Sequence, residues 1–62
     1  MTNEDLRREM RANKIYNWQV AHVLGVCEQT IIRWFRLPMS EEQLNKVSDA
    51  IERIKAGGVQ NA

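Results

Sequence analysis

Hydrogen-bonding side chains recur at helical spacing between residues 28 and 36 of this chain. Arg33 follows Gln29 by four residues and Thr30 by three, so a helix would bring the three side chains to one face. A glutamine can pair bidentately with adenine and an arginine with guanine, each pair contributing about 1–3 kcal/mol of discrimination between bases. These residue types at this spacing favour direct contact with base edges in a groove of duplex DNA.

Two neighbouring residues extend this group, and each has two interpretations. Glu28 can accept a hydrogen bond from cytosine, or it can simply favour the positive end of a helix dipole. Ile32 can contact a thymine methyl group, or it can be a partly buried neighbour of the first predicted helix. The predicted base-reading residues are Glu28, Gln29, Thr30, Ile32 and Arg33.

A second set of polar residues is suited to the phosphate backbone. Two of them carry positive charge, and three lie on a predicted helix whose N-terminus is suited to bind an anion. The predicted phosphate-contacting residues are Lys14, Asn17, Gln19, His22 and Arg36, with Arg11 as a further candidate. For each of these residues, a solvated surface role is at least as good an interpretation.

Charge is distributed unevenly along the chain, although the net charge is only +1. Residues 7–36 carry six basic and two acidic side chains, a net charge of +4, whereas residues 1–6 contribute −2 and residues 37–62 contribute −1. A nearly neutral domain can still present one basic face to a polyanion. Ordinary solvated charges on helices would give the same count.

Four helices are predicted to position these side chains. The first is capped by Thr2 or Asn3 and runs to about residue 13. The second starts at residue 16 or 17 and ends at Gly25, which can adopt a positive φ without steric cost. The third spans about residues 28–36, and the fourth follows the capping box of Ser40 and Gln43 and ends at the glycines that follow residue 56.

Apolar residues at intervals of three and four predict the buried face of each helix. Val26 is expected to help to pin the second helix against the third, and Trp18 is expected to pack on the first helix. Arg7 is expected to turn away from the core, as are the other arginines of the first helix. The predicted core comprises Leu6, Met10, Val20, Ala21, Val23, Leu24, Ile31, Trp34, Phe35, Leu44, Val47, Ile51 and Ile54.

The segment WQVAHVLGVCEQTIIRWFR has the spacing of a helix-turn-helix at Ala21, Gly25, Ile31 and Trp34. It resembles the helix-turn-helix of phage repressor and Cro-type regulators. More closely, it resembles small helix-turn-helix proteins encoded by phages and mobile elements of Gram-positive bacteria. The resemblance covers about residues 15–55, and the chain is shorter than the five-helix repressor domain.

This resemblance implies an all-α fold, a compact four-helix domain like that of lambda repressor, with no β-wing. The domain is expected over residues 1–56, with its helix-turn-helix at about residues 17–36 and a flexible C-terminal tail at residues 57–62. The implied function is sequence-specific DNA binding and transcription regulation, as by a repressor of a phage or mobile element. The third helix would enter the major groove, and a homodimer would form on double-stranded DNA.

Two alternative functions remain open at the level of sequence. The protein can be an architectural DNA-binding protein of the excisionase type, which bends or organises DNA for recombination. It can also be a small phage-encoded inhibitor that binds a protein through a helix-turn-helix scaffold, since a fold does not determine its function. The basic bias of residues 7–36 favours DNA, whereas the low total charge keeps the inhibitor in consideration.

Other classes of function lack a sequence signal. The single histidine, His22, and the single cysteine, Cys27, cannot supply a structural zinc site, so we expect no metal. There is no Gly-rich phosphate loop and no cluster of acid, base and nucleophile, so we expect neither an enzyme nor a cofactor or small-molecule ligand. No signal peptide or membrane span is evident, and we expect a cytoplasmic protein with no membrane partner.

Overall fold

A computed structural model describes residues 1–57, and every regular element in this range is a helix. The helices are α1 (Asn3–Ala12), α2 (Asn17–Leu24), α3 (Glu28–Arg36) and α4 (Glu41–Lys55). No strand occurs among the described residues, so the expected all-helical architecture with four helices is confirmed for them. Residues 58–62, which belong to the predicted tail, lie outside the described range.

Thr2, rather than Asn3, caps α1. The backbone N–H of Asp5 donates to Thr2 Oγ1 at 3.2 Å, and the backbone N–H of Thr2 donates to Asp5 Oδ2 at 3.1 Å. Two N–H groups that the helix itself cannot satisfy are thus paired locally. Because Thr2 performs this task, the Asn3 side chain is available for contacts elsewhere in the fold.

The α1 helix ends in a Schellman motif built on a lysine. Lys14 has a φ of 55°, and the Ile15 N–H donates to the Met10 carbonyl oxygen at 2.8 Å. The Lys14 N–H donates to the Arg11 carbonyl at 3.2 Å, and both Met10 and Ile15 are buried, as the motif requires. A non-glycine residue in this conformation costs about 1 kcal/mol, so this bend is held by the packing around it.

Gly25 ends α2 with a φ of 72°, as predicted. The Val26 N–H donates to the Ala21 carbonyl at 3.0 Å, and the Gly25 N–H donates to the His22 carbonyl at 3.2 Å. Only two residues, Val26 and Cys27, then separate this corner from α3. Val26, which was expected to help to pin the two helices, is 38% exposed in this corner.

The start of α4 follows its predicted capping box. The Gln43 N–H donates to Ser40 Oγ at 3.2 Å, and the Ser40 N–H donates to Gln43 Oε1 at 3.0 Å. At its other end, α4 is tied to α1 by Lys55, whose Nζ lies 2.7 Å from Glu9 Oε2. The hydrogen bond to Glu9 raises the pKa of Lys55 above its ordinary value, against a smaller opposing effect of desolvation.

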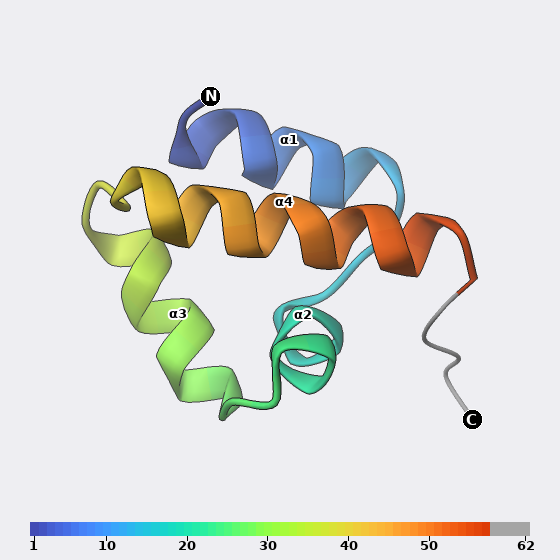
Figure 1. The fold of residues 1–62 in the computed structure, drawn as a ribbon. Helices are drawn as coiled ribbons and strands as arrows, with labels where there is room; N and C mark the ends of the chain where they lie inside the picture. The colour runs from blue at the N-terminus through green and yellow to red at the C-terminus, as the bar shows by residue number, and fades with distance from the viewer. Residues whose placement is uncertain (58–62) are drawn as a thin grey trace.

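The helices α1 and α4 lie side by side and run in the same direction, and α2 packs against both α3 and α4 (Figure 1). Trp34 is half-buried against the core rather than fully inside it. Trp18, expected on the first helix, is 41% exposed because it lies about 200° around α2 from the fully buried Val20. The buried core consists of Leu6, Met10, Ile15, Val20, Ala21, Ile31, Phe35, Met39, Val47, Ala50 and Ile51.

Candidate nucleic-acid interface

One face of α3 is buried and the opposite face is open to solvent. Ile31 is fully buried and Phe35 nearly so, which fixes the helix to the body of the protein. Gln29, Arg33 and Arg36 are all exposed. Because they are four and three residues apart, they form a line along the outer face of α3, which we call the α3 ridge.

The other predicted base-reading residues flank this ridge. Glu28 is exposed at the first position of α3. Thr30 and Ile32 are half-buried, and the helical repeat places them on opposite sides of the ridge. The structure therefore brings Gln29 and Arg33 together on the open face, with Thr30 and Ile32 at its margins.

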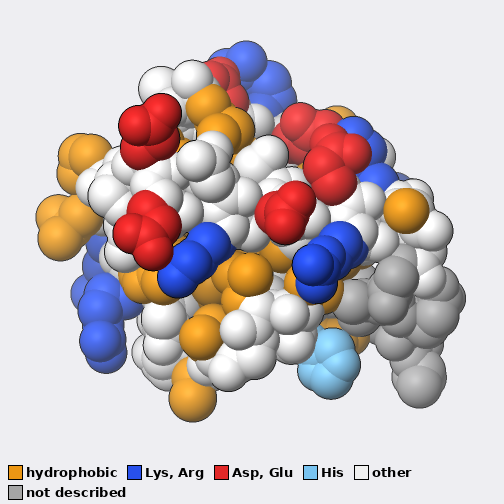
Figure 2. Space-filling model, viewed as in Figure 1, with side chains coloured by type: hydrophobic (Ala, Val, Ile, Leu, Met, Phe, Trp, Pro, Cys, Tyr) orange, Lys and Arg blue, Asp and Glu red, His pale blue; other side chains and the backbone are white. Residues whose placement is uncertain are grey.

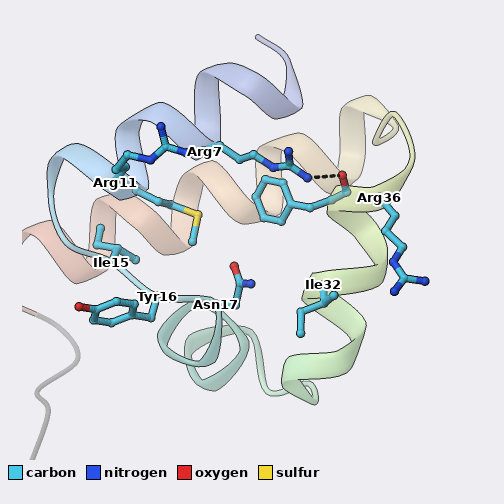
Figure 3. Close-up of a pocket in the computed structure, with 9 residues that line it drawn as sticks. Arg7, Arg11, Ile15, Tyr16, Asn17, Ile32 and Arg36 are labelled. Atoms are coloured by element: carbon cyan, nitrogen blue, oxygen red, sulfur yellow. Dashed lines mark hydrogen bonds between the residues drawn. The ribbon is translucent and has the colours of Figure 1, made fainter.

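A groove of about 480 Å³ runs between α1, the α1–α2 connection and α3 (Figure 3). Ile32 and Asn17 point toward its centre, whereas Arg11 and Arg36 extend away along its flanks (Figure 3). The floor is apolar, and none of its lining residues is acidic. The lining residues are Arg7, Met10, Arg11, Ile15, Tyr16, Asn17, Ile32, Phe35 and Arg36.

Three of the predicted phosphate-contacting residues lie around this groove. Asn17 is the first residue of α2, which has no side-chain N-cap, so its terminal N–H groups are suited to receive an anion. Lys14 is exposed and directly precedes Ile15 on the groove floor. Arg36 stands on the α3 side of the same groove and also belongs to the α3 ridge.

The remaining two predicted phosphate contacts lie elsewhere. Gln19 is buried, and its Oε1 accepts the Tyr16 N–H at 2.8 Å, so this side chain serves the start of α2 and is not on the open surface. His22 is exposed, but it lies five residues after Asn17, which is about 140° around the helix. Its imidazole therefore faces away from the groove.

Two residues that sequence reasoning missed hold the C-terminal end of α3. Arg7 was expected to point into solvent, but its Nη2 donates to the Phe35 carbonyl at 2.8 Å, and its guanidinium lies 5.4 Å from the centre of the Phe35 ring (Figure 3). Asn3 Nδ2 donates to the Leu37 carbonyl at 2.7 Å and to the Phe35 carbonyl at 3.4 Å. The Met39 N–H donates back to Asn3 Oδ1 at 3.1 Å.

The need for these contacts follows from how α3 ends. Leu37 is extended, with φ −119° and ψ 158°, because the residue before Pro38 disfavours the helical conformation. A helix that ends without a left-handed residue leaves its last carbonyl groups without partners, and donors from another element can satisfy them. The Leu37-Pro38 pair in the sequence indicates that the last carbonyl groups of α3 need partners, but it does not identify the donors.

Acidic and basic side chains are mixed over α4, whereas the charged residues that line the groove beside α3 are all basic. Acidic side chains gather over α4 and the neighbouring part of α1 on the face shown in Figure 2. The helix α4 carries four acidic and three basic residues, a net charge of −1: Glu41, Glu42, Asp49 and Glu52 against Lys46, Arg53 and Lys55. The groove beside α3, by contrast, is lined by three arginines and no acid, so a polyanion would be attracted to this side of the protein.

No group of three or more His, Cys, Asp or Glu side chains in residues 1–57 is arranged to hold a metal ion. Cys27 is an exposed free thiol at the start of α3. Within the same range, no helix has the length and apolar character needed to cross a membrane.

The chain matches no protein-family model, and comparisons with curated proteins and with solved structures give no match either. The features of the chain that bear on its function are the α2–α3 corner, the exposed face of α3 and the charges around the groove.

Proposed function

We propose that the protein is a sequence-specific DNA-binding protein in which α2, the Gly25 corner and α3 form a helix-turn-helix. The observation that carries the proposal is the α3 ridge. Gln29, Arg33 and Arg36 are exposed along one line, while the opposite face of α3 is anchored by buried Ile31 and Phe35. A rigid helix that presents such side chains is the element that reads bases in this class of protein.

In this proposal α3 enters the major groove, which at about 12 Å is wide enough to admit a helix. The helix has nine residues and is therefore about 13 Å long. That length spans roughly four base pairs at about 3.4 Å each. Gln29 would pair with adenine and Arg33 with guanine, and Arg36, at the C-terminal end of the ridge, would meet a phosphate.

The start of α2 is the proposed anchor on the DNA backbone. Asn17 and the uncapped N–H groups of α2 would bind one phosphate, and Lys14 would add a charge contact close by. The strained backbone of Lys14 supports this role, because left-handed non-glycine residues cluster at functional sites. The buried Gln19 and the turned-away His22 have no part in the proposed interface.

Within this class we propose a transcriptional regulator of a phage or mobile element, of the repressor and Cro type. Two features support this narrower assignment. Residues 15–55 resemble that group in sequence, and α3 leads through residues 37–40 directly into α4, with no strand in residues 1–57 that could form a wing. The proposal includes a cytoplasmic, non-catalytic protein that acts on double-stranded DNA as a homodimer.

Selection from a random pool of double-stranded oligonucleotides tests the proposal. Enrichment of a palindrome is the expected result. Enrichment of direct repeats would instead support the architectural alternative, and a pool that stays random at low salt would contradict sequence-specific binding. Low salt is needed because binding to phosphates releases counterions from the DNA, so rising salt weakens the binding of every sequence.

Variants then test the reading of bases. Arg33→Ala should weaken binding to the selected site by about 1–3 kcal/mol, with a much smaller loss on random DNA. The matched control is Arg53→Ala, which removes the same charge from an exposed position on α4. Equal losses on selected and random DNA for Arg33→Ala would show that this residue contacts phosphate and does not read a base.

A further inference from the structure

A hydrophobic patch lies where α3 passes into α4, on the far side of Arg36 from the groove described above. Leu37 is 69% exposed, more than any other large hydrophobic residue of residues 1–57, and Met1 beside it is 58% exposed. Hydrophobic side chains protrude at the left edge of Figure 2, where the α3–α4 link lies in Figure 1. We call this surface the Leu37 patch; its exposed residues are Met1, Leu37 and Pro38, and the half-buried Leu44 and the buried Met39 also line it.

Hydrogen bonds hold the backbone of the Leu37 patch in place. Asn3 Nδ2 holds the Leu37 carbonyl at 2.7 Å, and Asn3 Oδ1 accepts the Met39 N–H at 3.1 Å, so the backbone on both sides of Pro38 is fixed. Leu37 is therefore a hydrophobic side chain that the fold positions outward instead of leaving mobile. A preorganised contact residue loses little conformational entropy when a partner covers it.

We propose that the Leu37 patch is the surface through which two copies of this chain pair on DNA. This inference rests on the proposed function for stable pairing on DNA, whereas free copies would meet through the same surface only transiently. A two-fold interface needs one surface that complements itself. Here a protruding leucine lines a groove of about 420 Å³ that has both apolar and polar walls, so the leucine of each copy would enter the groove of the other.

The charges at the edge of the patch also complement themselves. Glu4 and Arg36 both line its groove, one acidic and one basic. A two-fold arrangement would bring Arg36 of each copy near Glu4 of the other, which favours the encounter of two free copies; on DNA the same guanidinium would turn to a phosphate. A surface with charges of one sign would repel its own copy, whereas the Leu37 patch carries both signs and favours pairing.

The position of the patch suits two α3 helices on one DNA duplex. Leu37 follows Arg36, the last residue of α3, so a two-fold axis at the patch would place the two α3 helices with their C-terminal ends toward each other. Their N-terminal residues, Glu28 and Gln29, would then point outward into separate major grooves. Two inverted half-sites are the expected binding site.

The small size of the patch predicts when the dimer forms. Its groove has nine lining residues, compared with about 20–30 residues on each side of a standard stable interface. The free protein should therefore be monomeric at micromolar concentration, and pairing should be driven by binding to adjacent half-sites. The second copy should bind on the order of 100-fold more tightly than the first, through a raised effective concentration.

Disulfide trapping tests the surface without DNA. In a Cys27→Ser background, which removes the native thiol, Leu37→Cys should form a disulfide-linked dimer much faster than Ala12→Cys. Ala12 is exposed at the opposite end of α1 and supplies a thiol away from the patch. Equal rates of cross-linking for the two variants would overturn the proposal.

Binding of Leu37→Ser to DNA that carries one or two half-sites tests the consequence. The variant should bind a single half-site like the native protein but lose cooperativity on two, and its thermal midpoint should be unchanged because Leu37 is exposed. Retained cooperativity would overturn the proposal. If Leu37→Cys cross-links but the native protein binds no selected DNA, the surface stands and the proposed DNA-binding function fails.

Discussion

Replacement of Arg7 by methionine tests how the C-terminal end of α3 is held. Methionine keeps an unbranched apolar stem over the Phe35 ring but removes the charge and the donors. The hydrogen bond from Arg7 Nη2 to the Phe35 carbonyl, at 2.8 Å, then disappears. Asn3 Nδ2, at 3.4 Å, remains as the only other side-chain donor to that oxygen among the described residues.

The size of the effect follows from the two interactions that Arg7 makes with Phe35. A hydrogen bond from a charged group contributes about 1.5–3 kcal/mol, and an exposed cation–π contact adds about 0.5–1 kcal/mol. Arg7 is exposed, and Asn3 still donates to the Phe35 carbonyl in the variant, so we take the lower end of both ranges. The expected loss in the free energy of unfolding is therefore about 2 kcal/mol. For a domain of this size, each 1 kcal/mol lowers the thermal midpoint by about 4–8 °C, so Arg7→Met should lower it by roughly 8–16 °C.

Thermal and urea unfolding followed by far-UV circular dichroism measure this loss. The matched control is Arg8→Met, because Arg8 is the next residue of α1, is exposed, and its side chain makes no hydrogen bond or ion pair within residues 1–57. Surface changes of this kind fall within about 0.5 kcal/mol. If Arg7→Met and Arg8→Met were equally stable, the contact with Phe35 would contribute nothing and the argument for an α1 anchor on α3 would fail.

Three further predictions concern the backbone and the one shifted pKa. Gly25→Ala should lower the free energy of unfolding, measured in urea, by about 1 kcal/mol; the cause is the φ of 72° alone, because nothing lies within 4 Å of the added methyl group. Gly25→Asn should lower it less, because asparagine tolerates a left-handed backbone better than alanine, and equal losses for the two variants would contradict this explanation. Lys14→Gly should stabilise the fold by about 0.5 kcal/mol, because glycine adopts a positive φ without strain. It should also weaken DNA binding and make the affinity depend less steeply on salt concentration; an unchanged dependence would exclude a phosphate contact by Lys14. Since the pKa of Lys55 is raised, its pairing with Glu9 stabilises the fold fully below the ordinary lysine pKa and is lost as pH rises through the raised value. Thermal midpoints measured against pH should therefore show a smaller alkaline loss in Glu9→Gln than in the native protein.

The sequence by itself determined those features that depend on residues within about four positions of one another. The capping box at Ser40, the positive φ of Gly25 and the helical spacing of the core residues are all of this kind. In each case both partners lie on the same turn of chain, so residue type and spacing are enough to predict the contact. The exposed line from Gln29 to Arg36 was also predictable, because the apolar residues of α3 define its buried face.

Only the tertiary structure decided which elements meet and which polar side chains remain available. The partners of Asn3 and Arg7 are 28 to 36 residues away, and no local pattern identifies them. Gln19 was predicted on the surface, but the start of α2 uses its oxygen, so burial and a hydrogen bond remove it from the interface. The groove beside α3 and the exposed position of Leu37 arise in the same way, since each depends on how α1 and α4 are placed against the ends of α3.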